Sequence, residues 1–227
     1  MNHPRLLELF WEFSRHLESL STLYFDSAVG YSILHERLQE YQAATRKLLY
    51  ESEYGTEEFQ DTCSMLYEHI SNCNYTPISM SPVMKQGEMK RRLRRDGSNT
   101  LLLGQQCIVS TYAYWEEYLR IEIGKAIGVL PADAIQSEDT RKVLNQHVVS
   151  DLWGDLRHIR NGIVHANGVA TSEIEKCKLI KWFKKGDTIE LTFDRMRDLF
   201  LALAHYRNKI HDMSLPKRTF RIPTSPR

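Results

Sequence analysis

Three side chains in the second half of the chain have the types needed to act on a phosphate ester. Arg160, Asn161 and His165 lie in the stretch DLWGDLRHIRNGIVHANG, residues 151–168. An imidazole titrates near neutral pH and can move a proton, whereas a guanidinium offers fixed donors that suit a phosphate or a developing oxyanion. No second carboxylate lies at metal-ligand spacing in this stretch, so the pattern favours chemistry without a metal ion.

A helix is predicted to position these groups. Its buried stripe is Leu152, Leu156, Ile159 and Ile163. Arg157, Asn161 and His165 recur every fourth residue and share another face, beside which Arg160 lies. Within one such helix Arg160 and His165 diverge by about 140°, so a single chain is expected to aim them poorly at one phosphate. Gly162 is expected to let a substrate backbone or a partner helix approach closely.

A second predicted helix, within residues 98–128, supplies a carboxylate. One narrow face of this helix is apolar and consists of Ile108, Tyr112, Trp115, Leu119 and Ile123. Glu116 falls on the flank of that face, whereas Glu117 points roughly opposite. Because burying an unpaired carboxylate is costly, Glu116 is expected to have a cationic partner.

The segment RNGIVH, residues 160–165, resembles the signature of HEPN domains (higher eukaryotes and prokaryotes nucleotide-binding), in which arginine, a polar residue and histidine follow at this spacing. The segment YWEEYLRIEI, residues 114–123, resembles the earlier family helix and aligns its acid with Glu116. The resemblance covers about residues 88–212. It implies an all-α helical bundle that acts as an RNA endonuclease without metal or cofactor. It also implies a homodimer whose two motif helices face each other across a shared active-site cleft.

The same resemblance assigns roles. His165 would be the general acid or base in the attack of a ribose 2′-hydroxyl on the adjacent phosphate, which leaves a 2′,3′-cyclic phosphate. Arg160 would hold the scissile phosphate, Asn161 would orient His165 or the phosphate, and Glu116 would pair with Arg160. A two-fold axis would bring arginine and histidine from both chains into one pocket.

A run of basic residues precedes the Glu116 helix and has two interpretations. With 30 basic and 29 acidic residues, the chain is not a uniformly basic nucleic-acid coat, although a local patch is compatible with this balance. The run is either a solvated helix end or a contact for the RNA backbone. The residues predicted to contact RNA are Arg157, Lys90, Arg91, Arg92, Arg94 and Arg95.

The remaining chain completes the predicted organisation. Residues 1–80 are expected to form long helices in or on the bundle, either one helix over about 6–50 or two joined near Gly30. Residues 81–213 are expected to form the catalytic bundle. A small β-hairpin is predicted at 178–193, before the last helix, because apolar residues alternate on both sides of a glycine turn. The basic tail, 214–227, is expected to be disordered.

No stretch has the length and apolar character of a signal peptide or a membrane span, so we expect a cytoplasmic protein without membrane contact. The enzyme hypothesis places it in a toxin or antiviral defence setting, with an antitoxin or defence-system protein as partner. An alternative is a non-catalytic HEPN-like dimer that binds RNA, nucleotide or a protein as scaffold or regulator. A third is an all-helical interaction protein in which the motif occurs by chance.

Overall fold

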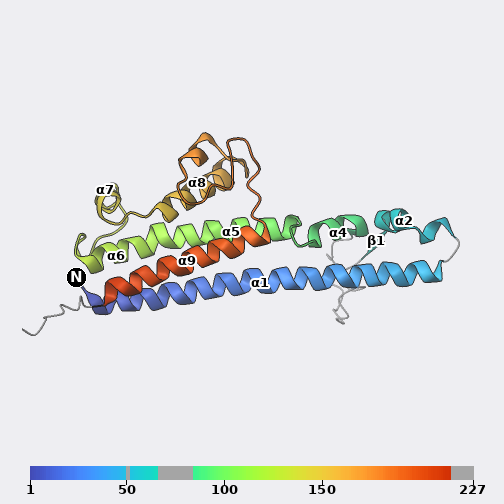
Figure 1. Cartoon of the computed structure of the whole chain (residues 1–227), viewed down its shortest axis with the longest axis horizontal. Coiled ribbons are helices and arrows are strands. Elements are labelled where there is room, and N and C mark those ends of the chain that lie inside the picture. Colours follow the sequence, from blue (N-terminus) through green and yellow to red (C-terminus); the bar gives the residue numbers. More distant parts are fainter. Residues whose placement is uncertain (50–51, 66–83, 216–227) are drawn as a thin grey trace, which may run out of the picture.

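The computed structural model describes residues 1–49, 52–65 and 84–215, and it confirms the all-α fold class (Figure 1). Its longest element, α1 (His3–Leu48), is a single helix that runs the length of the molecule. Asn2 caps it by accepting a hydrogen bond from the Arg5 backbone N–H. The helix continues through Gly30 because both halves have buried contacts, with Ala28 before the glycine and Leu38 after it.

The main bundle surrounds the first half of α1. Its other helices are α5 (Ser98–Tyr114), α6 (Arg120–Ile127), α7 (Glu138–His147), α8 (Asp151–His165) and α9 (Phe193–Ser214). Helix α9 runs alongside α1 in the opposite direction, and α8 lies on the outer side of α5 (Figure 1). The apolar face predicted between Ile108 and Ile123 is fully buried. On α8 the predicted stripe is also buried, except that Ile163 is half-buried.

A smaller cluster surrounds the second half of α1. Its elements are η1 (Glu53–Gly55), α2 (Glu57–Thr62), β1 (Ser64–Met65), β2 (Met84–Lys85) and α4 (Gln86–Leu93). The two short strands pair antiparallel. Its core is formed by Leu38, Met65, Met89 and Leu93, which come from both sides of residue 80. The described core therefore forms two clusters along α1, one on each half of the helix.

The β-hairpin predicted at 178–193 does not form; this part of the prediction was wrong. The turn is present, with Gly186 in a left-handed conformation (φ 89°), but Thr188 pairs with Val169 instead of with residues 180–182. The buried Asp155 side chain explains the difference. Its carboxylate accepts hydrogen bonds from the backbone N–H groups of residues 178, 179 and 180 at 2.7–2.8 Å. These donors are therefore not free to form a strand ladder.

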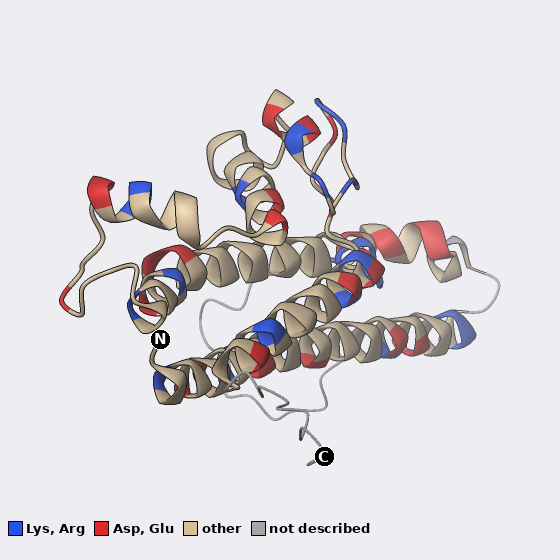
Figure 2. Cartoon of the chain, turned by 60° about the vertical axis from the view of Figure 1, so that its left-hand side comes forward, with Lys and Arg blue, Asp and Glu red and all other residues tan. Residues whose placement is uncertain are grey.

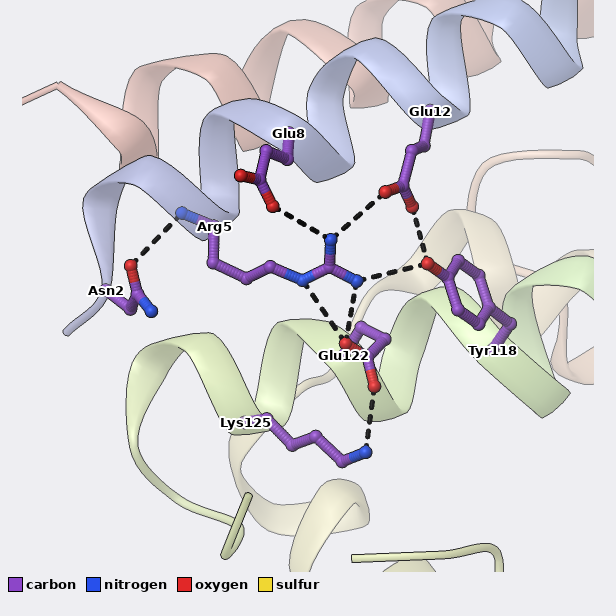
Figure 3. A network of polar contacts seen from close by, with 7 residues as sticks. All are labelled: Asn2, Arg5, Glu8, Glu12, Tyr118, Glu122 and Lys125. Carbon is purple, nitrogen blue, oxygen red and sulfur yellow. Dashed lines mark hydrogen bonds and ion pairs between the residues drawn. The ribbon is translucent and has the colours of Figure 1, made fainter. Parts of the chain in front are cut away.

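A polar network fastens the start of α1 to the rod formed by α5, η2 and α6 (Figure 3). Here η2 (Trp115–Leu119) is a π-helical turn between the two α-helices. The Arg5 guanidinium donates to Glu8, Glu12, Glu122 and the Tyr118 hydroxyl at 2.8–3.3 Å. Since Tyr118 belongs to η2, this network holds in place the same turn that carries Glu116.

None of the helices in the described ranges is long and apolar enough to cross a membrane. Of the tail predicted to be disordered, 214–227, Ser214 is instead the last residue of α9, and residues 216–227 lie outside the described residues. The elements that position the candidate site are therefore α8, the loop that follows it, and the π-helical turn η2.

Candidate active site

The structure brings the three motif side chains together at the C-terminal end of α8. Arg160 Nη1 lies 3.0 Å from His165 Nε2 and 3.1 Å from Asn161 Oδ1. The expectation that one chain would aim Arg160 and His165 apart was therefore wrong. The Cα positions do diverge around the helix, but the long arginine side chain spans that divergence, and His165 is the last residue of α8.

The contact defines the hydrogen-bonding role of His165 Nε2. A guanidinium can only donate hydrogen bonds, so Nε2 is the acceptor in this contact. The imidazole is solvent-exposed, and so is its neighbour Val164. The motif therefore presents a cation, an amide and a proton acceptor on an open surface.

Gly162 has a different role from the predicted one. A Cβ atom built on it would lie 2.4 Å from Ile189 Cδ1 and 3.0 Å from the Val169 carbonyl oxygen. The close approach that this glycine permits is made by the chain's own following loop. Asn167 (φ 51°) and Gly168 (φ 77°) reverse the chain, and the Gly168 N–H donates to the Gly162 carbonyl. No substrate or partner helix is needed to explain the glycine.

Glu116 does have the predicted cationic partner, but the partner is not Arg160. Its Oε2 accepts from Arg120 Nη1 at 3.3 Å and from the Tyr112 hydroxyl at 3.3 Å, and its Oε1 lies 3.8 Å from Arg141 Nε. The spacing of Glu116 and Arg120, four residues apart along a helical segment, is a signal that the sequence contained. The π-helical turn that aims Glu116 left no such signal in the periodicity.

A cavity of about 340 Å³ opens between Glu116 and the N-terminal half of α8. Its lining includes Tyr112, Glu116, Arg120, Asn145 and Arg157. Burial first, and then the Glu116 charge, raises the pKa of Tyr112 to about 12, so its hydroxyl stays protonated and donates. Arg157 lines this cavity and is one helical turn from Arg160. Glu116 lines the same cavity and does not lie at the motif as predicted.

Lys90 is a structural residue, and its predicted contact with RNA is wrong. Its side chain is buried and donates to Glu57 at 2.5 Å and to Asp61 at 3.1 Å. Burial alone would lower the pKa of this lysine, but the two carboxylates outweigh it and raise the pKa. Lys90 thus fastens α4 to α2 as a charged group.

The other residues of the basic run differ in their availability. Arg92 Nη2 contacts the Met84 sulfur, and Arg95 pairs with Asp194 at 3.0 Å and lies over the Phe193 ring. Arg91 and Arg94 are exposed. This run lies at the α4–α5 junction, further along the long axis than α8 (Figures 1 and 2). The run therefore lies beside the start of α9, which Arg95 contacts.

A basic turn that the sequence reasoning missed lies closer to the motif. The loop between η3 (Ser172–Lys176) and α9 carries Lys181, Lys184 and Lys185, all exposed, and is largely blue in Figure 2. The Gly186 N–H donates to the Ala170 carbonyl at 2.8 Å, so this turn packs onto the chain a few residues after His165. The sequence signal for this basic turn was the segment WFKKGD, residues 182–187, whose lysines were interpreted only as part of a hairpin.

In the described part of the chain, no group of three or more His, Cys, Asp or Glu side chains is arranged to hold a metal ion. Comparison with known family models, curated proteins and solved structures gave no match to this chain. The resemblance to HEPN domains therefore stays a prediction from the motif, and the geometry of α8 is the basis for assigning a function.

Proposed function

We propose that this protein is an RNA endonuclease that cleaves by transesterification, without a metal ion, and works as a homodimer. The observation that supports the proposal best is the contact between Arg160 Nη1 and His165 Nε2, with Asn161 on the same guanidinium nitrogen. It places a cation that can bind phosphate within hydrogen-bond distance of an imidazole at the end of α8.

The proposed reaction uses the two groups in order. A scissile phosphate competes for the Arg160 guanidinium and draws it away from His165, which frees the Nε2 lone pair. Nε2 then takes the proton of the ribose 2′-hydroxyl while O2′ bonds to phosphorus. The bond from phosphorus to O5′ breaks, and O5′ takes a proton from a general acid. The products are a 2′,3′-cyclic phosphate and a 5′-hydroxyl.

A second copy of the chain would supply that acid. One exposed His165 cannot be deprotonated as base and protonated as acid in the same step, whereas the His165 of a second copy, charged, can donate to O5′. Val164 and Val169, which flank His165 in the chain, are 46% and 41% exposed. Burial of these apolar side chains against a second copy would favour pairing at this end of α8.

The lysine turn is the proposed contact for the RNA backbone. The side-chain ammonium groups of Lys181, Lys184 and Lys185 have no hydrogen bond or ion pair to any residue that the structure describes. Exposed lysines near a reacting phosphate can neutralise the flanking phosphates of a single strand. This assignment replaces Lys90 and moves the RNA path from α4 to the loop after α8.

The test is incubation of the purified protein with total cellular RNA in EDTA, followed by analysis of the fragment ends. Cyclic phosphate ends from the parent protein, and a loss of about 10²-fold or more in His165→Ala, are expected. His147→Ala, which removes an exposed histidine at the end of α7, is the matched control and should cleave normally. Equal cleavage by His165→Ala contradicts the mechanism, and RNA binding without cleavage by the parent favours the non-catalytic dimer.

A further inference from the structure

The cavity beside Glu116 is held in shape by one largely buried arginine side chain. Arg120 donates through Nη1 to Glu116 Oε2, through Nη2 to Asn145 Oδ1 at 2.8 Å, and through Nε to the Val148 carbonyl. Only 11% of its side chain is exposed. Because both terminal nitrogens of one planar guanidinium are used, Glu116 and Asn145 are held side by side in a defined orientation.

This arrangement leaves a specific set of hydrogen-bonding groups unused. Glu116 Oε1 lies 3.8 Å from Arg141 Nε, which is beyond hydrogen-bond length, so it remains an acceptor. The Asn145 Nδ2 amide has no partner among the described residues and remains a donor. The two residues that Arg120 holds therefore offer the cavity a carboxylate acceptor and an amide donor.

That pattern matches one nucleobase edge better than the others. The Watson–Crick edge of guanine presents two N–H donors next to a carbonyl acceptor, which complements a carboxylate beside an amide N–H. Val148, Val149 and Trp153 supply apolar lining for the faces of the base. The volume, about 340 Å³, is in the range of small-ligand sites.

The position of Arg157 connects the cavity to the motif. Arg157 lines the cavity and has no hydrogen bond or ion pair to any described residue. Asn161 is four residues further along α8, about 6 Å along the helix axis. A strand whose scissile phosphate lies at Arg160 and Asn161 can thus place its neighbouring phosphate at Arg157 within one nucleotide step.

We propose that this cavity binds a guanine nucleotide, with the base at Glu116 and Asn145 and the phosphate at Arg157. In the RNA substrate it is the nucleotide next to the cleaved bond, a placement that rests on the proposed endonuclease function. Glu116 is then a specificity residue that reads the base, and Arg120 is the positioning residue that holds it.

The binding test uses the full-length chain and free nucleotides, so it does not depend on cleavage. Calorimetry with the 5′-monophosphates of guanosine, adenosine, cytidine and uridine should give at least tenfold tighter binding of the guanosine form. Glu116→Gln replaces one acceptor by a donor and should lose that preference, whereas the exposed neighbour Glu117→Gln should keep it. Asn145→Ala is the second variant if Glu116→Gln fails to fold, with the exposed Gln146→Ala as its matched control.

The outcomes separate this inference from the proposed function. Guanosine monophosphate binding that is lost in Asn145→Ala supports the cavity site even if no RNA is cleaved. A different result would overturn the cavity site but not the endonuclease function. In that result, RNA cleavage needs His165 but shows no guanine next to the cut, and all four nucleotides bind equally. Equal guanosine binding by Asn145→Ala and Gln146→Ala also overturns it.

Discussion

The two ends of α8 face arginines in different situations. At the C-terminal end, the half-buried Arg160 contacts Asn161 and the exposed His165. At the N-terminal half, Arg120 reaches in from the neighbouring helix and is buried with three fixed partners around a cavity. The first arrangement can give up its internal bonds to a ligand at little cost, whereas the second cannot.

This difference indicates separate roles for the C-terminal end of α8 and for the cavity beside its N-terminal half. An arginine that holds an exposed histidine can exchange that bond for a phosphate, which suits a reacting group. A buried arginine that orients a carboxylate and an amide keeps its geometry, which suits recognition of a ligand. Substitutions at the two ends should therefore affect different properties, stability at one and catalysis or RNA binding at the other.

The largest expected effect on stability is at the buried arginine. Arg120→Ala leaves Glu116 with a long contact to Arg141 and a single neutral donor, Tyr112, and should lower the free energy of unfolding by about 2 kcal/mol. Denaturant titration measures this change. The control is Arg141→Ala, whose side chain is 56% exposed, and its effect should stay below about 0.5 kcal/mol. Equal effects of the two substitutions would remove the distinction between a built cavity and an open surface.

The second prediction compares RNA binding by two basic segments, using substitutions that should leave folding stability unchanged. In a cleavage-deficient background, the double variant Lys184→Ala/Lys185→Ala should bind single-stranded RNA about tenfold more weakly. It should also reduce the slope of log affinity against log salt by about 1.4, because two phosphate contacts are lost. The double variant Arg91→Ala/Arg94→Ala should change neither quantity. The reverse result would return the RNA path to the α4–α5 junction.

The sequence predicted the helices well because their signal is local. The apolar period between Ile108 and Ile123 and the stripe on α8 depend only on residues three and four apart, and the structure confirms them. The long first helix was also expected, although periodicity alone did not decide whether Gly30 would interrupt it. Burial on both sides of the glycine decided this, which is a tertiary effect.

The parts that were wrong depend on partners distant in sequence. The hairpin failed because Asp155, more than twenty residues earlier, takes the backbone donors of residues 178–180. Lys90 was assigned to RNA because Glu57 and Asp61, its carboxylate partners, are about thirty residues away. Neither the residue types nor the spacing near these two positions indicated the contacts.

Acid should weaken the polar network that supports the turn beside the cavity. Burial alone would raise the pKa of Glu122, but hydrogen bonds from Lys125 and Arg5 outweigh it and lower the pKa. A carboxylate with a lowered folded-state pKa adds stability above its ordinary value of 4.5 and loses it as the pH falls through the folded value. We expect a loss of about 0.2–1 kcal/mol below pH 4.5.

The measurement is the midpoint of urea unfolding between pH 6 and pH 3, compared with Glu122→Gln. The substituted chain should lose less stability on acidification, since the titrating group is absent. Glu8→Gln, which removes a carboxylate that is 63% exposed, is the control and should follow the parent curve. A Glu122→Gln curve parallel to the parent would show that the network in Figure 3 does not couple to pH in this range.

The two glycines of α8 provide the finest test of the comparison, because the same added methyl group should have opposite effects. At Gly162 a Cβ would meet Ile189 Cδ1 at 2.4 Å and the Val169 carbonyl oxygen at 3.0 Å. The isoleucine tip can turn away, but the carbonyl belongs to the backbone, so Gly162→Ala should destabilise by about 1 kcal/mol. At Gly154 nothing lies within 4 Å of the added Cβ, so Gly154→Ala should stabilise by about 0.5 kcal/mol.

Gly154 also lines the cavity, which makes its substitution informative beyond stability. An alanine methyl there occupies space that the proposed nucleotide would use. Gly154→Ala should therefore bind guanosine monophosphate more weakly than the parent, although it unfolds at a higher urea concentration. Few binding defects coincide with increased stability, because most substitutions that impair a site also loosen it. Increased stability with unchanged nucleotide binding would indicate that the base lies elsewhere in the cavity, away from the wall formed by α8.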